Sequence, residues 1–377
     1  MVRNMGKDRS EAIIRDLFSS AGIEINGKNP WDIAVHDQRL YARLLRGHSL
    51  GLGESYMDGW WDSESVDEFI NKIFRAKLDE KVRGDWKILL YGLKTRIFNL
   101  QKLSRAFEVG EKHYDIGNDL YRAMLDKRMN YTCAYWKNAR NLDEAQEAKL
   151  DLVCKKIGLK PGMSVLEFGC GWGSFAKYAA EKYGAKVLGV TVSRAQVELG
   201  SQLCKGLPVE LRLQDYRLIS GKYDRVISIG IMEHIGYKNY RTYMEKASSC
   251  LKDDGIAFIH TIGGNIYNPG GDPWTNKYIF PNGMIPSICS IGRAMGGLFV
   301  MEDWHNFGPD YDKTLMVWHE QFERAWPKLK SSYNERFRRM WRYYLLSCSG
   351  GFRSRNVQLW QIVMTRQGAQ QPDIRYS

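Results

Sequence analysis

The feature that most constrains this fold is a glycine-rich turn between a short apolar strand and a helix. Residues 165–168 form the predicted strand, the sequence GCGWG follows at 169–173, and a helical pattern continues to residue 182. In an open α/β sheet this turn is where ligands bind, because glycine lets the backbone approach a ligand and the helix N-terminus offers unpaired N–H groups. The alternative is a tight turn that binds nothing.

Strands and helices continue to alternate along the chain. Further strands are predicted at 186–191, 209–213, 225–231, 255–262 and 358–365, with helices at 193–204, 237–251, 311–325 and 331–348. Strands that are separated by helices indicate βαβ units around a buried parallel sheet. The sequence therefore predicts an α/β fold in which helices sandwich the sheet, preceded by a small, mainly helical N-terminal domain.

An acidic residue before the glycines indicates the kind of ligand. A dinucleotide-binding turn normally has the spacing GxGxxG, whereas here Glu167 precedes a GxGxG spacing. A carboxylate suits a cationic sulfonium ligand with a free ammonium group better than a phosphate cradle does. The pattern is typical of the S-adenosyl-L-methionine (AdoMet) loop in the Rossmann-like sheet of class I methyltransferases. We therefore expect Glu167, Gly169, Gly171 and Gly173 to contact AdoMet.

Residues after the second and third strands are also expected to contact AdoMet. Class I enzymes often place an acid after the second strand for the ribose hydroxyls, but this strand ends at Thr191 without one. We expect Thr191 and Gln196 to supply those hydrogen bonds. Each could instead cap a turn, as Ser193 is expected to cap helix 193–204. Three residues follow the third strand, where adenine contacts usually arise: Gln214, Asp215 and Tyr216.

Length and charge limit the domain organisation and the kind of partner. The 377 residues are 44% hydrophobic and 26% charged, which excludes wholesale disorder and suits two domains or one large one. The 55 Lys and Arg outnumber the 43 Asp and Glu, and the resulting net charge of +12 favours an anionic partner, either nucleic acid or a membrane surface. We predict an N-terminal lipid- or substrate-associated domain at 1–88, a basic linker at 89–108 and an AdoMet-dependent catalytic domain at 109–377.

The cysteines and apolar runs indicate the compartment. The seven cysteines are odd in number and have no CxxC spacing, which argues against a disulfide framework or a metal site and favours a reducing compartment. The first 18 residues alternate charged and apolar side chains, unlike a signal peptide. No apolar run approaches the roughly 18–20 residues that span a bilayer. We therefore expect a cytoplasmic protein with at most peripheral membrane contact.

Short motifs along almost the whole chain resemble the bacterial cyclopropane-fatty-acyl-phospholipid synthases. They include GLGESYMDGWW at 51–61, HYDIGNDL at 113–120, YTCAYW at 131–136, EHIG at 233–236, HTIG at 260–263 and GPDYD at 308–312. Their number and order are more specific than the glycine turn, which alone indicates only a methyltransferase. The resemblance implies that the AdoMet methyl group is transferred to the cis double bond of an acyl chain in a membrane phospholipid. Loss of a proton then closes a cyclopropane ring.

The same resemblance implies a bound bicarbonate ion as the base, in a dry pocket that protects a carbocation from water. Carried over motif by motif, its cage and the candidate catalytic set comprise Cys133, Glu233, His260, the Ile262 backbone and Tyr311. Tyr131 and Thr132 are expected at the methionine end of AdoMet. Cys348 is a further catalytic candidate, with a buried structural thiol as the alternative. Taken alone, His260 is better explained as a core histidine.

The resemblance and the positive charge together imply the partners: an anionic phospholipid bilayer at the inner face of the cell membrane, and a second copy in a homodimer. The helix around 331–344 carries Phe337, Met340, Trp341 and Tyr344 on one face with arginines beside it, which suits lipid headgroups and, equally, a protein core. The alternatives are a nucleic-acid methyltransferase, an enzyme that gives carrier-linked chains a methyl branch, and a non-catalytic lipid- or AdoMet-binding module. No nucleic-acid module is recognisable, so we expect no nucleic-acid partner.

Overall fold

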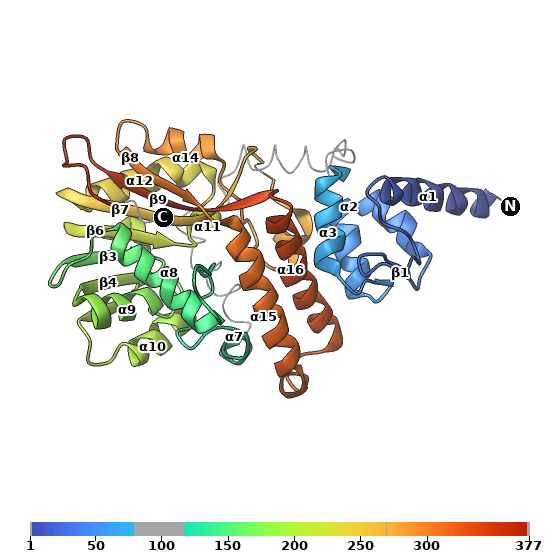
Figure 1. The fold of residues 1–377 in the computed structure, drawn as a ribbon, viewed down its shortest axis with the longest axis horizontal. Helices are drawn as coiled ribbons and strands as arrows, with labels where there is room; N and C mark the ends of the chain where they lie inside the picture. The colour runs from blue at the N-terminus through green and yellow to red at the C-terminus, as the bar shows by residue number, and fades with distance from the viewer. Residues whose placement is uncertain (1, 79–116, 269, 375–377) are drawn as a thin grey trace. The chain divides into compact units, whose positions relative to one another are not determined.

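The computed structural model describes residues 2–78, 117–268 and 270–374, which divide into two compact units (Figure 1). Unit 1 comprises Met1–Phe98, Gly270–Pro281 and Tyr311–Val357, and unit 2 comprises Asn99–Pro269, Asn282–Asp310 and Gln358–Ser377. Unit 1 thus combines three separate stretches of sequence. The predicted boundaries at 88 and 108 and the linker between them lie outside the described residues, so this division stays a prediction.

Unit 2 is built on a seven-stranded sheet with the strand order β5-β4-β3-β6-β7-β9-β8. Its strands are β3 (Ser164–Phe168), β4 (Lys186–Thr191), β5 (Val209–Leu213), β6 (Tyr223–Ile229), β7 (Leu251–Gly264), β8 (Val300–Asn306) and β9 (Val357–Thr365). The first five of these pair in parallel, and β8 pairs with β9 in antiparallel fashion. The sheet therefore has the parallel core that the alternating sequence pattern predicts.

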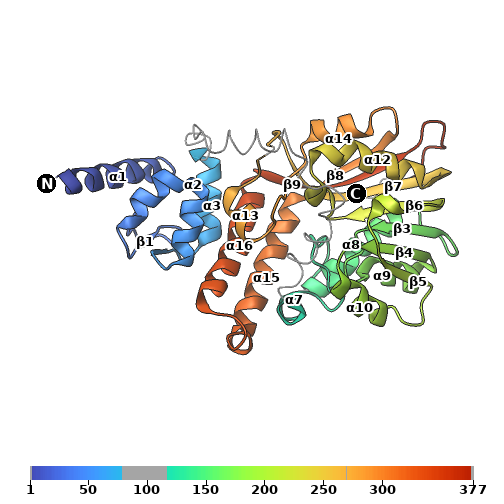
Figure 2. The ribbon, with the colours of Figure 1, turned by 180° about the vertical axis from the view of Figure 1, so that it is seen from behind.

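Helices cover both faces of this sheet, as the front and back views show (Figures 1 and 2). One face carries α8 (Leu142–Lys156), α9 (Ser174–Tyr183) and α10 (Arg194–Leu203), and the other carries α12 (Tyr240–Ser249) and α14 (Ile288–Met295). Successive strand residues point to opposite faces. Accordingly, Val165 joins the apolar cluster under α8 and α9, whereas Leu166 joins the cluster under α12 and α14.

β8 was not predicted from the sequence, because a strand at the edge of a sheet need not be apolar. β8 is the edge strand and pairs only with β9, so it carries the mixed sequence VMEDWHN rather than an apolar run. The helix at α8 was also not predicted, and β7 begins four residues earlier and ends two residues later than the expected 255–262. The longer β7 gains its order from its neighbours in the sheet and not from local sequence alone.

Unit 1 is mainly helical. It contains α1 (Val2–Ser19), α2 (Arg39–Met57), α3 (Val66–Arg75), α13 (Pro273–Tyr278), α15 (Gly308–Leu329) from Tyr311 onward, α16 (Glu335–Arg353), and a short ladder of β1 (Ala34–Val35) and β2 (Trp61–Asp62). The α16 helix packs against α2 and α3, and its Trp341 and Tyr344 are buried. Arg338 is paired with Glu323 and Arg339 with Asp62. Of the two interpretations of helix 331–344, core packing is therefore the one observed.

Gly53 of α2 is explained by close packing within unit 1. A Cβ atom on Gly53 would lie 2.3 Å from the indole of Trp274 in α13, a distance that no side chain tolerates. Trp274 is 2% exposed, and its ring lies 4.7 Å from that of Tyr343 in α16. The glycine therefore lets α2 and α13 approach each other around a buried tryptophan.

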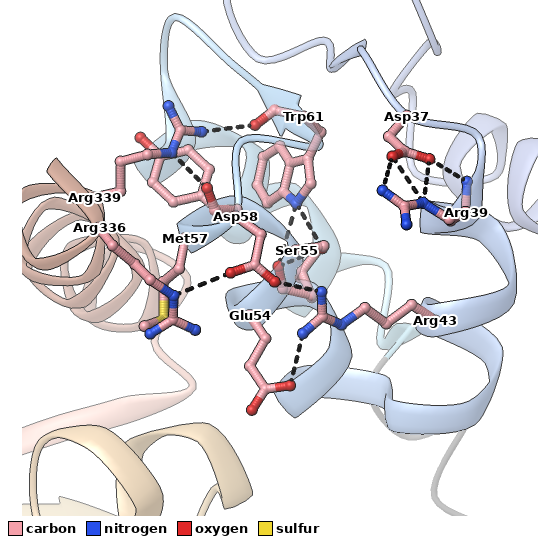
Figure 3. A network of polar contacts seen from close by, with 12 residues as sticks. Asp37, Arg39, Arg43, Glu54, Ser55, Met57, Asp58, Trp61, Arg336 and Arg339 are labelled. Carbon is pink, nitrogen blue, oxygen red and sulfur yellow. Dashed lines mark hydrogen bonds and ion pairs between the residues drawn. The ribbon is translucent and has the colours of Figure 1, made fainter.

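An ion-pair network includes Glu54, the residue after Gly53, and Asp58 (Figure 3). Arg43 bridges Glu54 at 2.9 Å and Asp58 at 2.7 Å, and Arg336 reaches Asp58 at 3.0 Å. Glu54 also accepts from Lys277 at 2.5 Å. Burial alone would raise the pKa of Glu54, but the hydrogen bonds from Lys277 and Arg43 outweigh it and lower the pKa to about 2. Every carboxylate of this network is thus paired.

Candidate active site

A cavity of about 200 Å³ lies in unit 2 at the carboxyl ends of the parallel strands, where open α/β sheets bind ligands. All but one of the residues predicted to contact AdoMet line it: Tyr131, Thr132, Glu167, Gly169, Gly171, Thr191, Gln196, Gln214, Asp215 and Tyr216. The exception is Gly173, which is the N-cap of α9 with φ 79° and packs near Leu211 and Cys204. Its predicted role is therefore better described as shaping the turn.

The glycine turn is held in place by backbone bonds and by the cavity wall. The N–H groups of Gly169 and Cys170 both donate to the carbonyl of Val190, at 2.8 and 3.0 Å. Gly169 has φ 74°, and a Cβ there would lie 2.0 Å from the side chain of Ile231, another lining residue. Gly171 has φ 54° and no atom within 4 Å of an added Cβ. Backbone conformation requires glycine at both positions, and only at Gly171 is the space beside it open.

Glu167, near the end of β3, is the acid that the sequence singles out. It is buried, and its Oε2 atom has no hydrogen-bond partner among the described residues. Burial raises the pKa of Glu167 well above its usual range, and the nearby charge of Lys149 opposes that shift. A buried carboxyl oxygen without a partner is costly and suits a ligand that brings its own donor, as the AdoMet ammonium does. The residues present therefore fit AdoMet.

Lys149 of α8 lines the same cavity, and sequence reasoning missed it. It is 1% exposed, and its Nζ atom donates to Asn130 Oδ1 and Thr132 Oγ1, both at 3.0 Å. Burial lowers the pKa of Lys149. Ser174 of α9 also donates to Asn130 Oδ1, at 2.7 Å. This polar cluster ties residues 130–132 to two helices. Lys149 could not be told from its neighbouring lysines, because its burial arises from contact with 130–132.

The other end of the cavity holds the residues predicted for ribose and adenine. Thr191 Oγ1 donates to Gln196 Oε1 at 2.7 Å, and Ser193 caps α10 as predicted, accepting from the Gln196 N–H. Asp215 accepts from Arg217 at 2.8 and 2.7 Å. Arg217 also lines the cavity and was not predicted. A ligand that bonds to Asp215 must therefore share its carboxylate with Arg217.

A second reactive cluster begins at Glu233 in α11 (Met232–Ile235), directly after β6. Glu233 Oε1 accepts from the Ile262 N–H at 2.6 Å, whereas Oε2 is buried and has no partner among the described residues. Burial raises the pKa of Glu233 to about 7, against the hydrogen bonds from Ile262 and Thr261. The group therefore titrates near neutral pH and can carry or accept a proton there.

His260 lies two residues before Ile262 on β7, so the two side chains share one face of the sheet. It is 1% exposed, and the Gln361 amide nitrogen lies 3.4 Å from its Nδ1 atom. With Gln361 donating to Nδ1, the ring proton resides on Nε2, which has no partner among the described residues. Burial and the charges of Lys149 and Lys156 lower the pKa of His260 well below its usual range. The ring is therefore neutral, and with this orientation of the Gln361 amide its donor is Nε2–H.

These groups fit an anion such as bicarbonate. The Nε2–H group of His260 is an unused donor, and the Glu233 carboxyl can be either protonated or ionised near neutral pH. The Ile262 N–H is already accepted by Glu233, so an anion would have to share it. Cys133 is buried with its thiol 3.1 Å from the Ala134 carbonyl. Its neighbour Thr132 packs against Gly230, whose N–H donates to the His260 carbonyl at 2.8 Å. The structure thus joins Glu233 to the Ile262 backbone by a hydrogen bond and places His260 two residues earlier on the same strand, with Cys133 on an adjoining segment.

The remaining two candidates belong to unit 1. Tyr311, in α15, contacts Phe352 and Trp318, with ring centroids 4.6 and 6.0 Å apart. Cys348 is half-buried in α16, and burial raises its pKa to about 12. At neutral pH the Cys348 thiol is therefore protonated, which suits its structural alternative better than catalysis. The catalytic roles of both residues stay predictions.

Comparisons with known proteins decide the family. Residues 101–362 match the family model described as mycolic acid cyclopropane synthetase. The chain belongs to this family. It is 51% identical over 354 residues to the cyclopropane-fatty-acyl-phospholipid synthase of Escherichia coli (strain K12), covering 94% of this chain and 93% of that relative. The predicted family resemblance and enzyme class are confirmed.

Solved structures of this family confirm the fold class. The cyclopropane synthase MmaA2 from Mycobacterium tuberculosis aligns with a TM-score of 0.65 and 27% identity, covering 71% of this chain and 100% of that one. The mycolic acid cyclopropane synthase CmaA1, complexed with SAH and CTAB, aligns with a TM-score of 0.65 and 30% identity, covering 69% and 98%. Unit 2 therefore has the class I methyltransferase fold that the sequence predicts.

The described residues also bear on membrane spans and metal ions. None of their helices has the length and apolar character needed to cross a bilayer. Within the same ranges, His, Cys, Asp and Glu side chains form no group of three or more that could hold a metal ion.

Proposed function

We propose that this chain transfers the methyl group of AdoMet to the cis double bond of an unsaturated acyl chain in a membrane phospholipid and closes a cyclopropane ring, with bicarbonate as the base. The observation that carries the proposal is the pairing of two sites in one unit. A cavity lined by Glu167, whose Oε2 atom has no hydrogen-bond partner among the described residues, lies at the strand ends. Within the same ranges, Oε2 of Glu233 in α11 and Nε2 of His260 in β7 also have no partner.

The first task of the site is to orient a methyl donor in a dry space. AdoMet supplies an electrophilic methyl group on sulfur, and an alkene is a weak nucleophile, so alignment and exclusion of water carry much of the rate. Glu167 offers an acceptor for the ammonium group, and the open side of Gly171 lets the ligand approach the backbone. The Lys149 cluster holds Tyr131 and Thr132 at the other wall.

The second task is to remove a proton after methyl transfer. A C–H bond of the added methyl group breaks, and its electron pair forms the second ring bond. Bicarbonate supplies the base when bound. The neutral His260 offers Nε2–H to hold such an anion, and Glu233, with its pKa raised to about 7, holds or accepts the neighbouring proton. Cys133 and the Ile262 backbone belong to the proposed cage in unit 2, and the role of Tyr311, which belongs to unit 1, stays a prediction.

The proposed setting follows from the substrate. We propose peripheral association with anionic phospholipid at the inner face of the cell membrane, supported by the net charge of +12. We also propose a homodimer, on the family resemblance alone. Sedimentation of the purified protein, with and without vesicles, tests both.

Product analysis tests the reaction. The purified protein is incubated with AdoMet and vesicles of unsaturated phospholipid, and the fatty acids are analysed by mass spectrometry and proton NMR. The proposal predicts one added CH2, loss of the alkene signal and ring protons in the spectrum. A methylene branch of the same mass would instead support a branching methyltransferase, and methylation only of added RNA would overturn the lipid assignment. In carbonate-free buffer we expect turnover to fall and to return when bicarbonate is added.

A further inference from the structure

We infer that an exposed apolar surface of unit 2 docks onto the phospholipid bilayer; this inference rests on the proposed function, which makes a membrane lipid the substrate. The surface comprises Ile266, Tyr267, Ile285 and Ile288, which we call the isoleucine patch. Their side chains are 63%, 42%, 37% and 49% exposed. Large apolar side chains that gather on one surface mark a contact site more often than an idle surface does.

Backbone pairing brings the two halves of the patch together. The β7 strand ends at Gly264, whose N–H donates to the Pro286 carbonyl at 2.9 Å and which forms an isolated parallel bridge with Ser287. An added Cβ on Gly264 would lie 3.6 Å from Ile285. Residues 266–267 therefore leave the sheet beside residues 285–288, and all four belong to unit 2.

The patch is continuous with the proposed proton-transfer cluster. His260 and Ile262 lie on the same β7 strand that ends in the patch. On the other side, the Met284 N–H donates to the Glu233 carbonyl at 2.8 Å, and Ile285 is the next residue. An acyl chain that leaves a bilayer for the cluster must cross water unless an apolar surface beside the cluster meets the membrane. The isoleucine patch is such a surface.

The charges around the patch fit an anionic lipid surface. Residues 282–299 include a single charged side chain, Arg293, although 26% of the whole chain is charged. Arg293 is exposed and forms no ion pair within the described ranges. On α14 it shares the exposed face with Ile288, Cys289 and Gly292, while Ile291, Ala294 and Met295 face the core. Beside it, Arg241 of α12 donates to the Ala294 and Gly296 carbonyls and is paired with Glu245, so that pair adds no net charge. A face of α14 with one cation and no carboxylate suits the interface of an anionic bilayer.

Vesicle binding by a double variant tests this inference. In Ile266→Asn/Ile288→Asn, we expect the partition coefficient onto fluid, saturated phosphatidylglycerol vesicles to fall about tenfold or more, because two buried apolar contacts are lost. Saturated vesicles contain no alkene, so binding is measured apart from turnover. The control is Leu203→Asn/Leu213→Asn, two exposed leucines, 39% and 37% exposed, on α10 and β5 at the opposite side of the sheet. The control should bind as the parent does.

The outcomes separate this inference from the proposed function. Loss of vesicle binding with turnover retained on detergent-dispersed unsaturated lipid supports the inference. Unchanged vesicle binding in the patch variant overturns it, whether or not the parent makes a cyclopropane. A change in oligomeric state with unchanged vesicle binding also overturns it and would make the patch an interface between copies. If the parent makes no cyclopropane, the proposed function fails, but vesicle binding still tests the patch.

A fluorescent label gives an independent readout, because Cys289 is the exposed cysteine among the seven and lies on the patch face of α14. A polarity-sensitive probe on Cys289 should shift to shorter wavelength when phosphatidylglycerol vesicles are added. The same probe placed by Leu203→Cys in a Cys289→Ser background should stay in water. Equal responses from the two positions would contradict docking through the patch.

Discussion

Glu54 in unit 1 and Glu233 in unit 2 show the same side chain in two opposite environments. Glu54 accepts hydrogen bonds from Lys277, Arg43 and Tyr278, and its pKa falls to about 2. Glu233 accepts from the Ile262 N–H, its second oxygen has no partner among the described residues, and its pKa rises to about 7. Burial raises the pKa of both groups and acts more strongly on the deeper Glu233, whereas only Glu54 has cationic partners that outweigh it.

The comparison separates charges that stabilise the fold from charges that serve a ligand. A sheltered carboxylate with cationic partners contributes to stability, whereas a buried carboxyl without partners costs stability. In unit 1, charged side chains form ion pairs that join α2, α13 and α16 (Figure 3). Unit 2 keeps Glu167, Glu233 and His260 incompletely paired around one sheet edge. The incompletely paired groups of unit 2 thus cost folding stability at the place where we propose AdoMet binding and proton transfer.

The largest expected effect is on turnover. Glu233→Gln keeps an oxygen for the Ile262 N–H but cannot take or hold a proton, so we expect kcat to fall about 1000-fold. Glu233 does not line the AdoMet cavity, so the dissociation constant for AdoMet, measured by calorimetry, should change less than about threefold. Normal turnover in this variant would place the proton-transfer cluster elsewhere.

The same substitution should raise stability at alkaline pH. A carboxyl whose folded pKa is raised holds its proton more tightly when folded, so its stability contribution is present below about pH 4.5 and is lost as pH rises through about 7. Glu233→Gln should therefore be more stable than the parent at pH 8, by on the order of 3 kcal/mol, and similar at pH 4. Chemical denaturation at both pH values measures this. A destabilised variant at pH 8 would show that Glu233 is fully paired.

The opposite effect on stability is expected for the corresponding substitution of Glu54 in unit 1. Glu54→Gln removes the ion pairs to Lys277 and Arg43 and should cost about 1–2 kcal/mol of unfolding free energy at pH 7. Because the folded pKa of Glu54 is lowered to about 2, the parent should lose this stability as pH falls from about 4.5 toward 2. The variant should lose less over that range. Equal acid sensitivity in the two proteins would contradict a paired Glu54.

The smallest effect is expected at a surface pair. Lys127 and Asp143 lie 2.9 Å apart, but the lysine side chain is 87% exposed. Water and salt screen such a pair, so Lys127→Ala should leave the melting temperature unchanged within error. A clear loss of stability here would mean that proximity alone, and not burial, sets the value of the ion pairs in unit 1.

The sequence predicted those parts of the molecule that local pattern determines. Glu167, Gly169 and Gly171 could be placed because strand, turn and helix follow one another directly, and the structure puts them around a cavity. The edge strand β8 was missed because its mixed residues show no apolar run. The burial of Lys149 was missed because residues 130–132, distant in sequence, create it.

The sequence also could not predict which carboxyl groups have hydrogen-bond or ion-pair partners. The motifs do not predict that Glu54 is paired and that one oxygen of Glu233 is not, because two of the three partners of Glu54, Lys277 and Tyr278, lie more than 200 positions later in the sequence. The helix at 331–344 shows the same limit of local pattern. Its aromatic face suits lipid and core equally, and its contacts with α2 and α3 decide for core. The amino-acid pattern of a helix allows both lipid contact and core packing, and contacts with residues distant in sequence determine which occurs.

A crystal structure with an unreactive AdoMet analogue and bicarbonate tests the central claim most directly. The account predicts the analogue in the cavity beside Glu167, and a planar anion within hydrogen-bond distance of His260 Nε2 and Glu233 Oε2, facing the analogue's sulfonium-equivalent position. Density that shows both atoms bonded to other protein groups, with no anion between them, would contradict it.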